Sequence, residues 1–148
     1  MGGMPFDAGL AQLNRDECMA LLANVTFGRV GVSVDALPAI LPVTIAVRDD
    51  AVMFRTVPGT KLALAASRSV LAVEADHYDP SIGDGWSVLV RGVASELVDE
   101  GEIARARELL KGSWIDGAAE HYVRVGCDLV TGRRLRHLAP AETWPDPG

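Results

Sequence analysis

The sequence predicts a mainly β domain of the α+β class, a small antiparallel barrel with helices packed outside it. Most apolar stretches are short, rich in β-branched residues and joined by connections of hairpin length, which makes neighbouring strands antiparallel. Helical patterns are too sparse to alternate with strands as they do in a doubly wound sheet. The length of 148 residues fits one domain, so we expect residues 1–148 to fold together, with flexible ends over about 1–12 and 140–148.

The composition excludes several classes of function. The chain holds 14 basic and 20 acidic residues, and its net charge of −6 argues against general nucleic-acid binding, which needs a basic face. No apolar run approaches the ~18 residues of a membrane span, and the first residues lack the pattern of a signal peptide. Two cysteines, Cys18 and Cys127, are too few for a disulfide scaffold. We therefore expect a cytoplasmic protein without nucleic-acid or membrane partners.

The first predicted element is a helix over about residues 15–24. Asn14 and Glu17, three residues apart, have the form of a capping box. Apolar residues then recur at the spacing of one helix face. These residues are Cys18, Leu21, Leu22 and Val25.

Three strands joined by tight turns are predicted next. Valine alternates with small residues over 28–34, a period of two that is typical of a strand. The segment 39–47 is apolar on both faces, so we expect it to be buried on both sides or to lie at an interface. Pro42 within it has no N–H, which indicates an edge, a bulge, or a place where something other than a strand approaches. Residues 51–57 form the third strand.

The second half of the chain predicts the remaining strands and two helices. A helix capped by Asp99 carries its apolar stripe at Ile103, Ala106, Leu109 and Leu110. The other expected elements are a short helix at about 61–67, strands over 69–76 and 86–98, a loop over 77–85, and a last strand pair over 121–130 and 132–138.

The segment most typical of a functional site joins a predicted strand to a predicted helix through a Pro-Gly turn. Arg55 and Lys61 flank this turn. Lys61 would lie in the first helical turn, where the helix dipole disfavours a cation by ~0.3–1 kcal/mol, unless an anion occupies the helix start. Arg55 and the hydroxyls of Thr56 and Thr60 could donate to the same anion, for which a phosphate is the obvious candidate. Alternatively, both cations are ordinary surface residues.

Other side chains carry weaker signals. Glu74, Asp76 and Asp79 gather negative charge, and they form either a carboxylate pair for acid–base chemistry or a solvated loop. Trp86 is either a core residue or an aromatic wall for a planar ligand. The three histidines lack the spacing of metal ligands, so we predict no metal site. No catalytic residue is identified.

The order of these segments resembles a known family. GRVGVSV, LPAILPVTIAV, FRTVPGTKL and GWSVLVRGVASEL follow one another as in the pyridoxamine 5′-phosphate oxidase-like, FMN-binding split-barrel proteins. The similarity is greatest to the small actinobacterial-type members, which include deazaflavin-dependent ones, and it covers about residues 13–138. It implies a six-stranded antiparallel split β-barrel with flanking helices, forming a homodimer with two flavin sites at the interface.

The resemblance also implies which residues bind the cofactor. The family's phosphate-binding segment corresponds to residues 55–61, its ring-contacting strand to 41–44, and the position of a polar flavin contact to 86–87. The implied cofactor-binding residues are Leu41, Pro42, Val43, Thr44, Arg55, Thr56, Thr60, Lys61, Trp86 and Ser87.

Departures from well-known members narrow the expected activity. The vitamin B6 oxidases carry Arg-Gln-Val where this chain has Trp86-Ser87-Val88, and residues 132–138 lack their Arg-Leu-His-Asp segment. The nitroimidazole-resistance relatives carry a histidine in place of Arg55. The implied function is therefore that of an oxidoreductase which holds FMN and passes hydride or electrons to a small substrate of unknown identity.

Three alternatives remain open at this point. One is a reductase that uses the deazaflavin coenzyme F-420, whose charged tail could be bound by Arg29, Arg48 or Arg91. The second is a flavin-binding or carrier protein without turnover. The third is a structural dimer with an empty site.

Overall fold

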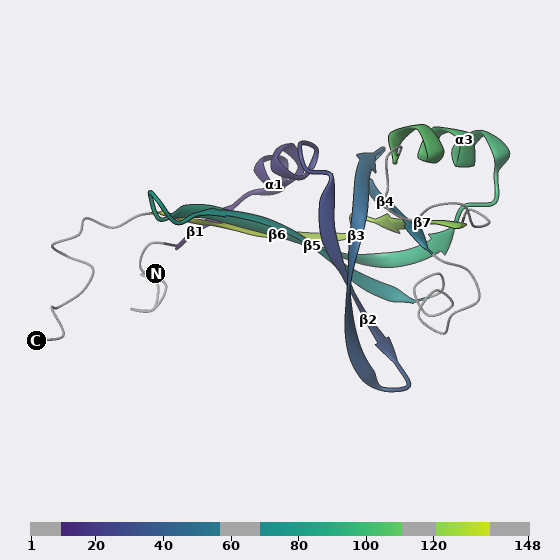
Figure 1. The fold of residues 1–148 in the computed structure, drawn as a ribbon, viewed down its shortest axis with the longest axis horizontal. Helices are drawn as coiled ribbons and strands as arrows, with labels where there is room; N and C mark the ends of the chain where they lie inside the picture. The colour runs from purple at the N-terminus through teal and green to yellow at the C-terminus, as the bar shows by residue number, and fades with distance from the viewer. Residues whose placement is uncertain (1–9, 57–68, 111–120, 137–148) are drawn as a thin grey trace, which may run out of the picture.

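The computed structural model describes residues 10–56, 69–110 and 121–136 of the chain. Within these ranges it contains mostly β-strands and two helices, which confirms the predicted class (Figure 1). The elements are β1 (Leu10–Leu13), α1 (Arg15–Leu22), β2 (Phe27–Val34), β3 (Leu37–Arg48), β4 (Ala51–Thr56), β5 (Val70–Asp79), β6 (Asp84–Glu96), α3 (Glu100–Leu109), β7 (His121–Gly126) and β8 (Leu129–Leu135).

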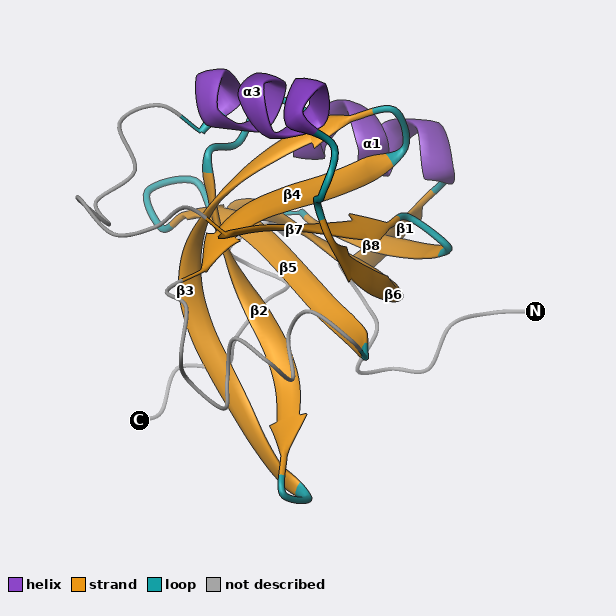
Figure 2. Cartoon of the chain, turned by 90° about the vertical axis from the view of Figure 1, so that its right-hand side faces the viewer, coloured by secondary structure: helices purple, strands orange, loops and turns teal. Residues whose placement is uncertain are grey.

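Six antiparallel strands close into a barrel, as expected (Figure 2). Their order is β6-β5-β2-β3-β4-β7, and β7 returns to pair with β6. The long strand β6 makes this closure possible, because it pairs with β8 over residues 85–91 and with β7 over residues 94–96. β8 and β1 extend the sheet beyond the barrel.

The barrel interior is filled mainly by valines from the inner face of each strand. Val30, Val73, Val88 and Val123 have no exposed surface, and they follow the period of two that a half-buried strand requires. Helix α1 adds Cys18 and Leu22 to the same core.

Helix α1 begins where the sequence predicts. The N–H of Glu17 donates to Asn14 Oδ1 at 2.8 Å, and the N–H of Asn14 donates to Glu17 Oε1 at 3.0 Å, which completes the capping box. The helix packs against β8 at Gly132, where an added Cβ would lie 2.5 Å from Cys18 Sγ. A glycine is therefore required there for the helix to approach the strand.

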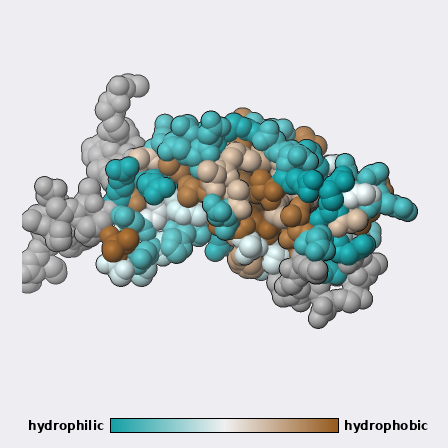
Figure 3. Space-filling model, turned by 90° about the horizontal axis from the view of Figure 1, so that it is seen from above, coloured by the Kyte–Doolittle hydropathy of each residue, from teal (hydrophilic) through white to brown (hydrophobic). Residues whose placement is uncertain are grey.

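Helix α3 covers a second, smaller cluster outside the barrel. Asp99 caps it, since its carboxylate accepts the N–H of Glu102 at 3.0 Å. Ala106 and Leu110 are buried as predicted, whereas Leu109 is 45% exposed. Seen from the side of the two helices, hydrophobic residues gather in the middle of the surface, with hydrophilic residues on either side (Figure 3).

Two tight turns shape the first three strands into hairpins. Asp35 and Ala36 have φ of 50° and 64°, and Asp49 and Asp50 have φ of 52° and 55°. Two successive residues in this left-handed region define the turn that matches the twist of a two-stranded hairpin. The β2–β3 hairpin extends well beyond the barrel (Figure 2).

The segment expected as a loop over 77–85 is mostly strand. β5 continues to Asp79 and β6 begins at Asp84. The Asp79 carboxylate accepts hydrogen bonds from the backbone N–H and the hydroxyl of Ser81, and these bonds close the turn within four residues. These two bonds also hold the pKa of Asp79 below its ordinary value, first through the hydroxyl and then through the backbone N–H.

Three further elements differ from the expectation, were not predicted, or lie outside the described residues. The last two strands divide at residues 127–128, not near 131, and Gly132 lies inside β8, where it contacts α1. β1 was not predicted, since its four residues gain strand structure only by pairing with β8. The helix expected at 61–67 lies outside the described residues.

Candidate functional site

The predicted ring-contacting segment lies on an edge of the sheet. β3 pairs with β2 over residues 37–44 and with β4 over residues 45–48. The N–H of Ile45 donates to the Thr26 carbonyl in the chain preceding β2, at 3.0 Å. Because backbone groups alternate between the two edges of a strand, Pro42 and Thr44 face the edge away from β2. Within the described ranges no strand pairs with that edge. Pro42 therefore lies at a strand edge, which is one of the three positions that its missing N–H indicated.

The side chains of this segment divide between two faces. Val43 is 6% exposed and lies in the barrel core, and Leu41 packs against that core. Pro42 is exposed on the opposite face, where the neighbouring Ile40 is 72% exposed. The expected burial on both sides is therefore wrong for a single copy of the chain. The other expectation, an interface, remains a prediction.

The end of β4 lies beside this edge. The β3–β4 ladder ends with Ile45 opposite Phe54, so Arg55 follows at the point where β3 leaves β4 for β2. Arg55 is half-buried opposite Tyr122 of β7, and it forms no ion pair with a carboxylate of the residues described. The Thr56 hydroxyl donates to the His121 carbonyl at 3.4 Å, so its hydrogen is used within the sheet.

The structure therefore brings two of the three predicted segments into one corner, residues 41–44 and 55–56. Thr60 and Lys61 follow in the chain but lie outside the described residues. We call the edge of β3 together with the end of β4 the β3–β4 corner. A half-buried guanidinium beside backbone groups can bind an anion and orient a planar ring with polar edges.

Trp86 and Ser87 lie elsewhere in the same chain. They are on β6, and β2 and β5 separate that strand from β3. Trp86 is half-buried and packs against the barrel core, whereas Ser87 pairs with Asp76 and Arg133 across the neighbouring strands. One copy of the chain thus holds the described residues of the predicted site in two separate places.

A hollow of about 220 Å³ adjoins Trp86 and Ser87. An engineered cavity of roughly 150 Å³ is known to admit benzene, so this hollow could admit a small ring. A Cβ on Gly85 would lie 2.6 Å from the His77 carbonyl oxygen, so a larger residue at this position would disturb the wall of the hollow. The lining residues are Asp76, His77, Tyr78, Gly85, Trp86, Ser87, Arg133 and Leu135.

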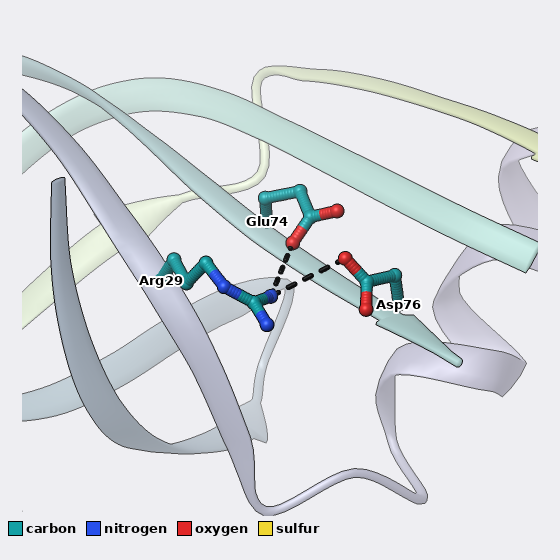
Figure 4. A network of polar contacts seen from close by, with 3 residues as sticks. All are labelled: Arg29, Glu74 and Asp76. Atoms are coloured by element: carbon teal, nitrogen blue, oxygen red, sulfur yellow. Dashed lines mark hydrogen bonds and ion pairs between the residues drawn. The ribbon is translucent and has the colours of Figure 1, made fainter. Parts of the chain in front are cut away.

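An ionic cluster joins β2 to β5 on the outside of the barrel. Arg29 Nη1 donates to Glu74 Oε1 at 2.9 Å and to Asp76 Oδ2 at 3.3 Å (Figure 4). Partial burial, together with the hydrogen bond and charge of Asp76, raises the pKa of Glu74 to about 7 against the opposing effect of Arg29. The acidic residues were expected as a carboxylate pair or a solvated loop, and only strand register reveals their shared arginine.

Other classes of site have little support within the described ranges. No three His, Cys, Asp or Glu side chains there gather to hold a metal ion. Cys18 and Cys127 are free and buried, and burial raises the pKa of both thiols. Neither described helix is long and apolar enough to cross a membrane.

Residues 14–134 match the family model described as pyridoxamine 5′-phosphate oxidase. The chain belongs to the pyridoxamine 5′-phosphate oxidase family. The uncharacterized protein Rv0080 of Mycobacterium tuberculosis is 41% identical over 131 residues, which cover 85% of this chain and 86% of that protein.

Solved structures of other family members have the same fold. An FAD binding protein from Mycobacterium smegmatis is 39% identical, with a TM-score of 0.71, and the match covers 84% of this chain and 97% of that one. A Corynebacterium glutamicum protein, provisionally named a pyridoxamine 5′-phosphate oxidase, is 31% identical with a TM-score of 0.75, over 93% of this chain and 100% of its own. The family resemblance of the sequence is thus confirmed. The matched structures include proteins that are named for flavin binding.

Proposed function

We propose that this protein binds a flavin at the β3–β4 corner and acts as a flavin-dependent oxidoreductase on a small substrate. The observation that carries the proposal is made on the described residues, where an edge of β3 that pairs with no described strand meets the half-buried Arg55, which has no carboxylate partner there. A flavin needs both features, because its ring has polar edges and its side chain ends in a phosphate.

The residues present fit that cofactor. Pro42 faces the edge of β3 with which no described strand pairs, so its carbonyl group would orient the polar rim of the ring. Arg55 would bind the phosphate, with Thr60 and Lys61 as further predicted donors. The bound flavin would supply the hydride or electron transfer, while the chain holds it, orients it and limits its contact with water.

We infer that the cofactor carries the FMN moiety common to FMN and FAD, and we propose FMN itself. The relative from Mycobacterium smegmatis, 39% identical, is named for FAD binding, which supports a flavin of this kind. The tail of coenzyme F-420 would need extra cations. Arg29 is already bound to two carboxylates, and Arg48 lies 3.6 Å from Asp49, so two of the three expected cations are engaged.

We also propose that the protein is a homodimer with flavin at its interface. Apolar side chains are exposed on the outward face of β2, β3, β5, β6 and β8, and apolar side chains exposed together on one face of a sheet are typical of a protein contact. A second copy could bring its Trp86 and Ser87 to the β3–β4 corner of the first. The exposed side chains are Phe27 (48%), Ile40 (72%), Val70 (66%), Val93 (60%) and Leu129 (59%).

A cytoplasmic location is part of the same proposal. Cys18 and Cys127 remain free thiols inside the core. Free buried thiols are compatible with a reducing compartment, where structural disulfides are rare.

The test of the cofactor is a titration of the flavin-free protein with FMN, FAD and coenzyme F-420. We expect FMN or FAD to bind near one per subunit. Arg55→Ala should weaken binding tenfold to a hundredfold, because a charge-assisted contact contributes ~1.5–3 kcal/mol. Arg48→Ala, at the far end of β3, is the matched control and should leave the affinity for FMN and FAD unchanged. Failure to bind any of the three would refute the proposal.

A second measurement separates an enzyme from a carrier. The flavin-loaded protein would be supplied with an excess of a chemical reductant and a panel of small acceptors, and loss of each acceptor would be followed through repeated turnover against a sample without protein. We expect at least one acceptor to be reduced catalytically. Stoichiometric binding without turnover on any acceptor would instead favour the carrier alternative.

A further inference from the structure

The Arg29–Glu74–Asp76 cluster lies within the apolar face that we assign to the homodimer. Strand register places Arg29 between Pro42 of β3 and Glu74 of β5, and it places Leu89 of β6 on the other side of Glu74. Residues paired in this way point to the same face of a sheet. The exposed Ile40 lies on the same face, two residues along β3 from Pro42, so it is a neighbour of the cluster.

The charges of the cluster do not balance. One guanidinium meets two carboxylates, and a single nitrogen, Nη1, donates to both of them. The group carries a net charge of −1 when both acids are ionised, and it is neutral when one of them holds a proton. The three side chains are partly exposed, Arg29 by 45%, Glu74 by 32% and Asp76 by 42%.

A contact that covered this face would change the balance between the two states. Removing a net charge from water is unfavourable, whereas a neutral, hydrogen-bonded group is buried at a lower cost. A two-fold dimer uses the same patch on both copies, so one contact would bury a cluster from each copy. The lower cost of burying the neutral group favours the protonated form in the dimer.

We propose that this cluster lies inside the homodimer contact and that association of two copies takes up protons on Glu74, so the dimer tightens as the pH falls. The inference rests on the proposed homodimer and adds the regulation of that same interface. The raised pKa of Glu74, about 7 in the single chain, puts the transition in the physiological range.

The other charged groups on this face set the competing outcome. Arg91 of β6 lies two residues after Leu89 on the same face. Arg133 of β8 pairs with Ser87, which lies two residues before Leu89. Neither arginine is among the groups that shift the pKa of Glu74. If either one met the cluster across the two-fold axis, the ionised form would be favoured and the dimer would tighten as the pH rises.

The test is sedimentation equilibrium of the full chain between pH 5.8 and 8.2 at constant ionic strength. We expect the dimer dissociation constant to rise at least tenfold over this range, because at the higher pH each copy loses a proton when the dimer separates. Glu74→Gln keeps the shape of the side chain without its charge, and its dissociation constant should stay near the low-pH value at every pH. Glu100→Gln, on α3, is the matched control and should keep the wild-type slope.

Each outcome has a defined meaning. An equal slope in wild type and Glu74→Gln, or a dimer that tightens as the pH rises, would overturn the inference while leaving the homodimer in place. A monomer at every pH would overturn the homodimer itself, and flavin titration would show separately whether the cofactor proposal survives. Asp76→Asn provides a second neutral variant, which should also flatten the slope if Glu74→Gln does not fold.

Discussion

Glu74 is a carboxyl group whose surroundings favour its neutral form. Its folded pKa of about 7 lies above the ordinary value of 4.5, so the folded chain binds a proton that the unfolded chain releases more easily. The stability from this proton is fully present below about pH 4.5 and is lost as the pH rises through 7. Because the group is partly exposed, we estimate the loss at about 1 kcal/mol.

Glu74→Gln should remove that dependence. We expect the variant to match the wild type near pH 5 and to exceed its free energy of unfolding by about 1 kcal/mol at pH 8. Urea unfolding at the two pH values, at one protein concentration, measures the difference. Glu100→Gln should behave as the wild type, and an equal loss in Glu74→Gln would contradict the assignment.

Gly132 is a residue whose lack of a side chain has a structural purpose. An added Cβ would lie 2.5 Å from Cys18 Sγ and 3.1 Å from the Ser87 carbonyl oxygen. Gly132→Ala should therefore lower the free energy of unfolding by about 1–3 kcal/mol, as overpacking of a core does. Combining it with Cys18→Ala should recover part of the loss, and thermal unfolding of the four proteins in this double-mutant cycle checks it.

At the scale of elements, the β2–β3 hairpin contains a residue in an unfavourable conformation. Ala36 has φ of 64°, a region that glycine occupies without cost. Ala36→Gly should stabilise the protein by about 0.5–1 kcal/mol, because Asp-Gly is a preferred pair for this turn. Ala39→Gly, inside β3, should destabilise it by a similar amount, and chemical denaturation of both variants tests the contrast.

The elements that could be predicted are those specified by neighbouring residues. The capping box at Asn14 and the alternating valines of β2 are local signals, and both elements form where expected. β1 depends on pairing with β8, which is distant in sequence. The extension of β5 to Asp79 depends on the turn contacts of one serine, Ser81. No local pattern contains that information.

The candidate site was predictable by segment but not by arrangement. Spacing and resemblance predict a site at residues 41–44, 55–61 and 86–87. Among the described residues, the fold brings 41–44 and 55–56 together and leaves 86–87 apart. The cluster at Arg29 could not be assembled from the sequence, because it depends on the register between β2 and β5. That register is set by the hydrophobic pattern of the whole barrel, not by the three charged residues.

At the scale of the whole molecule, the exposed outer face should hold two copies together. Ile40→Glu would put a charge into that face, at a position where the side chain is 72% exposed in a single copy. We expect the dimer to dissociate at micromolar concentration and flavin binding to weaken with it. Light scattering after gel filtration measures the first effect, and cofactor titration the second.

Leu109→Glu is the matched control for this experiment. Leu109 is 45% exposed on α3 and belongs to a different surface. It should leave both the assembly and the affinity unchanged. If Ile40→Glu remained dimeric with full affinity, the contact would have to lie elsewhere.

The strand that closes the barrel comes late in the chain. β7, at residues 121–126, bridges β4 and β6, which are both synthesised before it. Until it emerges from the ribosome, the nascent protein carries two open strand edges, which can pair with other chains. Translation that stalls before this point should therefore leave a product that depends on chaperones and aggregates readily.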